Sequence, residues 1–237
     1  MNRLTTLCGA LSIVVASLAH AQDYSFQGFA TADAMNQMHA AVRDSMLEPA
    51  APGPQARATK PGTTGSYQSN RDISARVRAQ FVQFVRQTSG EQAARQIGAV
   101  LEKGDPVASW ASIVRENGLR PGNLGDALTA YWVLNWVMAN QSDNTRQQTQ
   151  AVLAQTRRAI ATTPALARLD DAGRQEMAEV LMLNFLLQHA VYINAIQRGD
   201  QDLQRRLGQA AVTRFRKEMN IDLLGLELSN AGFVARP

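Results

Sequence analysis

The sequence predicts an all-α protein: a single globular bundle of about six to seven helices around a buried central helix, preceded by a flexible Pro-rich N-terminal segment. Three observations lead to this prediction. Apolar residues recur at helical spacing along most of the chain, four of the eight prolines lie between residues 48 and 69, and the segment Gln175 to Arg198 is apolar in nearly every direction around a helix. We divide the chain into residues 1–21, 22–69 and 70–237.

The first residues have the order of a secretory signal peptide. Arg3 precedes an apolar run from Leu7 to Leu18, and small residues follow at Ala19 and Ala21. An apolar run of about 12 residues is too short to span a membrane comfortably. We therefore expect cleavage before Gln22, a periplasmic or secreted protein, and no transmembrane span after cleavage.

Composition limits which partners and which covalent cross-links we expect. Cleavage would remove Cys8, the only cysteine, so we expect no disulfide. The formal charge of +4 favours a weak attraction to anionic envelope surfaces. Exported proteins rarely meet nucleic acid, so nucleic-acid binding is not expected.

Residues 22–69 are predicted to be an N-terminal segment and a Pro/Gly-rich linker. Met35, Met38, Val42 and Met46 are spaced as on a short amphipathic helix that docks on the main body. The prolines and glycines after it predict a mobile linker. We expect residues 22–69 to contribute little to the fold.

Regular helices are predicted from residue 69 onward. Residues 69–72 resemble a capping box and open a helix that continues to about Gln87. A second helix ends at residues 103–104, where a lysine precedes a glycine. Asp105 and Pro106 have the residue types of an N-cap and a first helical position, and the third helix ends at residues 117–118.

Asn123 is predicted to cap the next helix, which is rich in large side chains. From here the sequence resembles a family of exported bacterial proteins catalogued only as a domain of unknown function. The likeness spans roughly Asp72 to Gly232, and the family offers no established catalytic or binding residues. The residues that carry it are Asn123-Leu124-Gly125-Asp126-Ala127, Tyr131, Asn135-Trp136, Asn220-Ile221-Asp222, Leu226-Glu227-Leu228 and Gly232.

Three further segments complete the predicted bundle. A more polar surface helix follows residues 142–144 and ends at residues 163–164. Residues 170–171 open the central helix with carboxylates at its electropositive end. Residues 199–200 stop it and start the last long helix, and we expect the tail after Met219 to be irregular or a short helix.

Candidate catalytic groups are few. His39 and His189 are the histidines left after cleavage, so we expect no metal site and no cofactor. A carboxylate pair acting on envelope glycans would use Glu176, Glu179 or Glu116. The alternative is that the first two are simply favourable near a helix N-terminus and that Glu116 lies on a wet helix face.

Two sets of side chains are candidate binding residues. The aromatic side chains of Tyr131, Trp132 and Trp136 would line a ligand groove or pack in the core. Asn184 and Gln188 share one face of the central helix, with His189 and Tyr192 on an adjacent face. Those amides either face a ligand or are buried and bonded to neighbouring helices.

Two functions are compatible with this sequence. The first is a non-enzymatic exported domain that binds another envelope or secreted protein. The alternative is a glycan- or lipid-active envelope enzyme that uses carboxylates. A deep cleft with facing carboxylates would favour the enzyme, whereas a filled bundle with a flat apolar patch would favour the binding domain.

Overall fold

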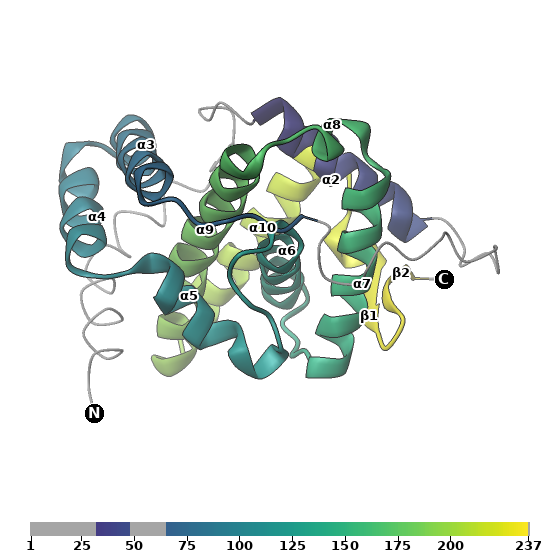
Figure 1. The fold of residues 1–237 in the computed structure, drawn as a ribbon. Helices are drawn as coiled ribbons and strands as arrows, with labels where there is room; N and C mark the ends of the chain where they lie inside the picture. The colour runs from purple at the N-terminus through teal and green to yellow at the C-terminus, as the bar shows by residue number, and fades with distance from the viewer. Residues whose placement is uncertain (1–31, 48–64, 237) are drawn as a thin grey trace.

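The computed structural model describes residues 32–47 and 65–236. Within these ranges the protein is a helical bundle with one C-terminal β-hairpin (Figure 1). The longest helix, α9 (Asp171–Gln197), runs through the middle of the bundle. The helices packed against it are α6 (Leu124–Asn140), α10 (Gln201–Met219), α3 (Arg71–Ser89) and α5 (Pro106–Val114). The prediction of an all-α bundle around a buried central helix is confirmed.

Helix α9 is buried around most of its circumference because apolar side chains occupy nearly all of its faces. By length and composition it is the one helix in the described ranges that could cross a membrane. However, 67% of its apolar 18-residue window is buried inside the protein. Its apolar surface is thus matched by the neighbouring helices, as in the core helix of a bundle.

Two helix starts lie where they were predicted. Asp105, the predicted N-cap, accepts a hydrogen bond from Val107 N at 2.9 Å. Asp200, at the predicted restart of the chain, accepts one from Leu203 N at 2.9 Å. Helix α3 starts one residue later than the capping-box pattern suggested, with Asn70 as its N-cap. A capping box that we had not predicted opens α7 (Arg146–Thr162), because Thr145 and Gln148 bond reciprocally there.

Helix α2 (Ala32–Leu47) belongs to the same hydrophobic core as the later helices. It packs against α7 and α10, and Met35, Met38 and Val42 are at most 1% exposed. The predicted docked helix is confirmed, but the expectation that everything before residue 70 contributes little to the fold is wrong for α2. The predicted signal peptide and most of the linker lie outside the described residues.

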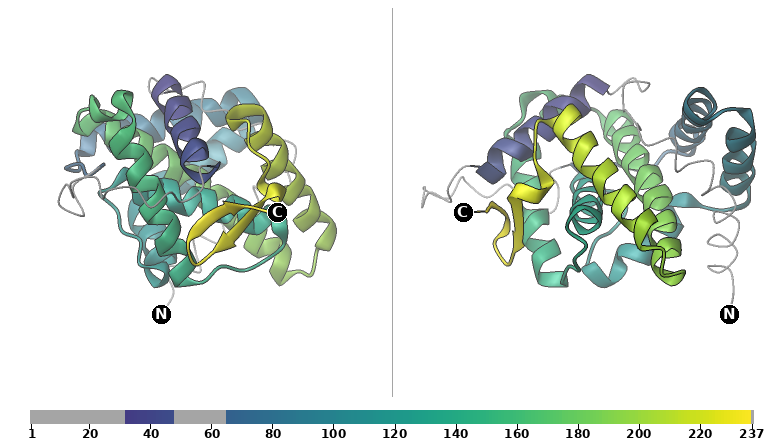
Figure 2. Two further views of the ribbon diagram at one scale, coloured as in Figure 1. Left: turned by 90° about the vertical axis from the view of Figure 1, so that its right-hand side faces the viewer. Right: turned by 180° about the vertical axis from the view of Figure 1, so that it is seen from behind.

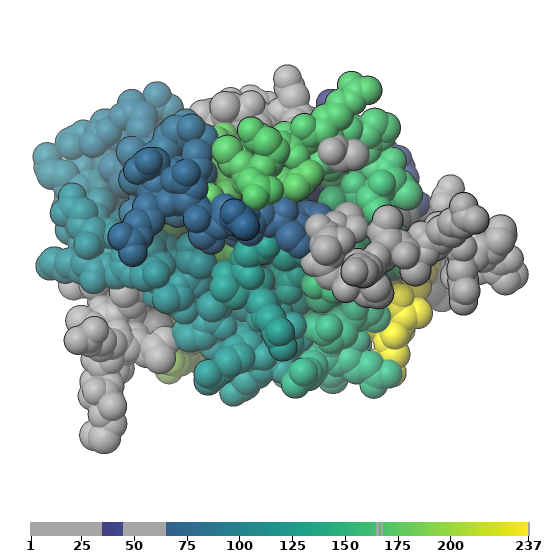
Figure 3. Space-filling model, in the orientation of Figure 1, coloured from purple at the N-terminus to yellow at the C-terminus, as the bar shows by residue number. Residues whose placement is uncertain are grey.

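Helices α3 and α4 (Glu91–Lys103) form a hairpin at one edge of the molecule (Figures 1 and 3). Gly90 joins them with φ +87°, a backbone conformation that glycine adopts at little cost. Helix α4 packs mainly on α3, and α3 in turn packs on α9. The hairpin is therefore held to the body largely through one of its two helices.

The tail after α10 differs from the prediction of an irregular or short helical segment. A 3-10 turn, η3 (Leu223–Gly225), leads into two antiparallel strands, β1 (Leu226–Ser229) and β2 (Gly232–Ala235). Seen from behind, this hairpin lies beside α7 and α2 (Figure 2). Gln155 of α7 pairs its side-chain amide with both backbone groups of Phe233 at 2.8 Å, as a third strand would. Strands of four residues are too short for a recognisable alternating pattern.

Two short elements connect the remaining helices. The 3-10 helix η2 (Arg115–Asn117) ends α5, and α8 (Pro164–Ala167) joins α7 to α9. An extended segment, residues 65–70, crosses the front of the bundle before α3 begins (Figure 1). We call this segment the strap.

Candidate functional site

The predicted aromatic residues lie in the core. Tyr131, Trp132 and Trp136 are 1%, 0% and 5% exposed. The indole N–H of Trp132 donates to His39 Nδ1 at 3.1 Å, and that of Trp136 donates to the carbonyl of Leu226 at 3.0 Å. Their polar atoms bond to other parts of the chain, so this position favours core packing over a ligand groove.

A buried polar cluster joins α6, α9 and α10, and we call it the central network. Asn135 Nδ2 donates to Gln188 Oε1 at 3.0 Å and to the carbonyl of Tyr131 at 2.7 Å. Arg214, only 5% exposed, donates from Nη2 to Asn135 Oδ1. Burial raises the pKa of the Tyr131 hydroxyl, while the nearby Arg214 charge acts in the opposite direction.

The three polar candidates on α9 are not brought together. Gln188 joins the central network, as expected of an amide bonded to a neighbouring helix. Asn184 instead donates to the carbonyl of Val180 in its own helix at 2.9 Å. His189 stacks on Phe185 at a centroid distance of 5.4 Å, and burial lowers the pKa of its imidazole.

The candidate acids have different surroundings. Glu116 is exposed in η2. The carboxylate of Glu176 is buried and pairs with Arg76 at 2.7 Å. Glu179 is also buried, and its Oε1 accepts hydrogen bonds from Ser74 Oγ at 2.7 Å and Gln175 Nε2 at 2.8 Å.

The strap links the N-terminal part of α9 to the loop before α6. Its backbone bonds to the loop before α6, with Tyr67 N to Gly122 O at 3.1 Å. Its other end bonds to Gln175, whose side chain accepts from Asn70 N and donates to Asn70 O, both at 2.8 Å. Burial and the charge of Glu179 raise the pKa of the Tyr67 hydroxyl. This arrangement fixes the position of the Glu179 carboxylate.

Beside Glu179 lies a shallow surface depression between α3, α5 and α9, with a volume of about 10 Å³, which is room for about one water molecule. We call it the edge depression. The residues lining it are Arg78, Pro106, Val107, Glu179, Met182 and Leu183. Arg78 is half-buried, and its guanidinium forms no ion pair or hydrogen bond with the described residues. Sequence reasoning missed Arg78, because its spacing marks it only as a polar position on an amphipathic helix.

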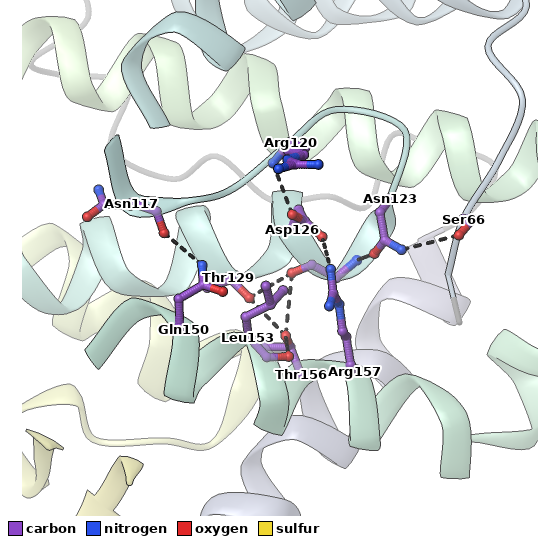
Figure 4. A network of polar contacts seen from close by, with 11 residues as sticks. Ser66, Asn117, Arg120, Asn123, Asp126, Thr129, Gln150, Leu153, Thr156 and Arg157 are labelled. Carbon is purple, nitrogen blue, oxygen red and sulfur yellow. Dashed lines mark hydrogen bonds and ion pairs between the residues drawn. The ribbon is translucent and has the colours of Figure 1, made fainter. Parts of the chain in front are cut away.

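Residues 123–127, which carry part of the family resemblance, connect the start of α6 to α7 (Figure 4). Asn123 caps α6 by accepting from Gly125 N at 2.8 Å. Asp126, 2% exposed, accepts from Arg120 N at 3.0 Å and from Arg157 of α7 at 2.9 Å. A Cβ at Gly125 would lie 3.1 Å from Asn123 Oδ1 and 3.2 Å from Arg157 Cγ. These residues therefore join the start of α6 to α7.

Among the described residues, no three His, Cys, Asp or Glu side chains converge as metal ligands would. The sequence matches, over residues 12–236, a family of unknown function designated DUF6683. Comparison with curated proteins and with solved structures gave no match.

Proposed function

We propose that this chain, which belongs to the family of unknown function, is an exported, non-enzymatic protein-binding domain of the bacterial envelope. One observation carries the proposal: the aromatic and amide side chains that could have lined a cleft are packed or bonded inside a filled core. The surface available to a partner is therefore the outside of the helical bundle.

The arrangement of carboxylates gives little support to the alternative, a glycan-active enzyme. Such enzymes need two carboxyl groups facing each other across the scissile bond, about 5–10 Å apart. Here the buried Glu176 is paired with Arg76, and Glu179 lines the edge depression together with Arg78 and four apolar residues. One carboxylate beside a guanidinium is not that arrangement.

The α3–α4 hairpin is the surface that best fits a protein partner. It stands at the edge of the molecule (Figure 3), and within the described residues α4 packs mainly on α3. Gln92, Arg95 and Ala99 are exposed along one face of α4. A helix face of this length is enough for the helix-based recognition that many complexes use.

Site-specific cross-linking tests this surface. A photo-reactive residue at Gln92 or Ala99, introduced into the full-length chain in its own cells, should give one reproducible cross-linked protein. The same residue at Thr213, which is exposed on α10, serves as the matched control and should not give that product. Equal cross-linking from α4 and Thr213, or none from α4, would contradict the proposed surface.

Export is tested separately. Protein isolated from the periplasm or the medium should begin at Gln22 when its N-terminus is sequenced, because Ala19 and Ala21 supply the small residues that signal peptidase reads. Recovery of the chain in the cytoplasm with Met1 retained would refute this part of the proposal.

A further inference from the structure

Helix α7 carries positive charge without any acidic residue. Its sequence contains Arg146, Arg157 and Arg158 and neither aspartate nor glutamate. The nearest acidic residues along the chain, Asp143 and Asp170, lie beyond its two ends. Arg146 and Arg158 are exposed, and their guanidinium groups form no ion pair or hydrogen bond with the described residues. The two ends of α7 therefore each present an uncompensated positive charge.

Arg120, in the loop before α6, extends this positive surface. Its backbone N–H donates to Asp126 Oδ1 at 3.0 Å, and Arg157 pairs with Oδ2 of the same carboxylate at 2.9 Å (Figure 4). Asp126 is only 2% exposed, whereas Arg120 is exposed. We call Arg120, Arg146, Arg157 and Arg158 the α7 basic face. It combines four positive charges with one negative charge that is buried.

Helix α10 is also rich in basic residues, but most of them are compensated or buried. Arg205 pairs with Asp202, Arg216 pairs with Asp222, and Arg214 lies in the central network. The positive charge of the α7 basic face is compensated only at Arg157 by the described residues. We therefore expect an anionic partner to bind at α7 before it binds at α10.

The α7 basic face lacks the side chains that anchor most protein partners. Among the described residues, the exposed large apolar side chains are Ile196 and Leu224, which lie in α9 and η3. The exposed positions that share a helix face with Arg158 are Ala154 and Ala161. Protein interfaces usually depend on large aromatic or apolar anchors. Arginines among alanines fit phosphate groups better, because a guanidinium binds a phosphate through paired hydrogen bonds.

We propose that the α7 basic face binds the anionic phospholipid headgroups of a membrane surface, with α7 lying along that surface. The backbones of Arg146 and Arg158 are about 18 Å apart at 1.5 Å per residue, so the two guanidinium groups contact different headgroups. Contact is with the phosphates alone, because this face has no large exposed side chain that could enter the acyl region.

This inference goes beyond the proposed partner binding and rests only on the export of the chain. Helices α4 and α7 lie at opposite ends of the bundle (Figures 1 and 2). A protein bound to a membrane through α7 would therefore leave α4 accessible to a partner. Vesicle binding is measured without that partner, and cross-linking from α4 does not depend on the arginines of α7. Either proposal can fail while the other holds.

The test is co-sedimentation with phospholipid vesicles of the chain that starts at Gln22, which contains every described residue. Vesicles of equal parts phosphatidylglycerol and phosphatidylcholine should bind at least about tenfold more tightly than phosphatidylcholine alone, because each arginine near an anionic surface strengthens binding about fivefold. Raising the salt from about 0.1 M to about 1 M should abolish the difference, because the charges are then screened.

Paired variants locate the contact. Arg146→Gln combined with Arg158→Gln should weaken binding to the anionic vesicles about 20–30-fold. The matched control is Arg206→Gln combined with Lys217→Gln on α10, which changes the net charge equally and should alter binding no more than about threefold. Circular dichroism melts check that both variants are folded.

Three outcomes would overturn the proposal. The first is equal binding to neutral and anionic vesicles. The second is an equal loss of binding in the two double variants, which would show that net charge matters and α7 does not. The third is binding to soluble polyglutamate without binding to anionic vesicles, which would identify an acidic polypeptide as the partner.

Discussion

Helix α9 carries two polar pairs with the same spacing and different surroundings. Gln175 and Glu179 are four residues apart near its start, and Asn184 and Gln188 are four residues apart further along. Both pairs are buried on the same helix. In the second pair, Gln188 bonds to Asn135 of α6, whereas Asn184 bonds within α9. The first pair lies between the strap and α3, at the border of the edge depression.

The difference shows that spacing on one helix does not reveal whether a polar side chain is enclosed by other helices or lies at the border of the surface. The neighbouring elements decide which it is. In the central network, Asn135 and Gln188 find partners inside the protein. Near the strap, Gln175 bonds to Asn70 and to Glu179, which borders the surface at the edge depression. Removal of a partner in the central network should therefore cost stability, whereas a change at the half-buried Arg78 should cost little.

The largest expected effect is in the central network. Asn135→Leu removes the acceptor of the Arg214 guanidinium and the donor to Gln188, and leaves a buried charge without this bond. Breaking one partner of a buried charged group costs about 3–5 kcal/mol, so the free energy of unfolding should fall by that amount. Urea unfolding followed by circular dichroism measures it.

The matched control for Asn135→Leu is a variant that removes the buried charge of Arg214. Replacing the buried Arg214 with Met removes the group that needs the bond, and replacement of buried ions by apolar residues is often neutral. The double variant with Asn135→Leu and Arg214→Met should therefore recover part of the lost stability. If the two losses simply add, the two residues do not form one network.

The second effect is a dependence on pH at the junction of α2 and α6. Burial lowers the pKa of His39 from its ordinary value of 6.5 to about 3, and its Nδ1 accepts the indole N–H of Trp132. Because the folded state favours the neutral imidazole, its contribution is fully present above pH 6.5 and is lost as the pH falls toward 3. The loss at pH 3 should be on the order of 4 kcal/mol.

Comparison between variants isolates this effect from the protonation of carboxylates. The difference in unfolding free energy between the parent and His39→Gln should change with pH between 6.5 and 3. The same difference for His189→Gln should change less, since His189 is less buried than His39. A pH-independent difference for His39→Gln would show that His39 is not held neutral by its surroundings.

The sequence predicted the local features better than the long-range ones. The caps at Asp105 and Asn123 were predictable because a cap depends on residues two or three positions away. The burial of α9 was predictable because it is apolar all round. The burial of Arg214 was not, since an arginine among other arginines on α10 has no local signal. Arg78 and Glu179 line the same depression only because α3 packs on α9.

The third effect compares single amides from the two pairs. Gln175 is fully buried and bonds to Asn70, Ser74 and Glu179, so Gln175→Leu should cost about 1–3 kcal/mol. It should also speed proteolysis within residues 65–70. Asn184→Leu should cost about 0.5–1.5 kcal/mol, because the hydrogen bond that its side chain makes within the described residues is to its own helix. Thermal melts give both values, and a larger loss for Asn184 would reverse the comparison.

The smallest expected effect on stability belongs to Arg78, which is half-buried on α3. Its guanidinium bonds to none of the described residues, so Arg78→Met should change the free energy of unfolding by no more than about 0.5 kcal/mol. Arg76→Met on the same helix is the matched comparison. That change removes the ion-pair partner of the buried Glu176 and should cost about 1–3 kcal/mol. Equal losses for Arg76→Met and Arg78→Met would mean that Arg78 stabilises the fold, and the edge depression would then resemble the central network.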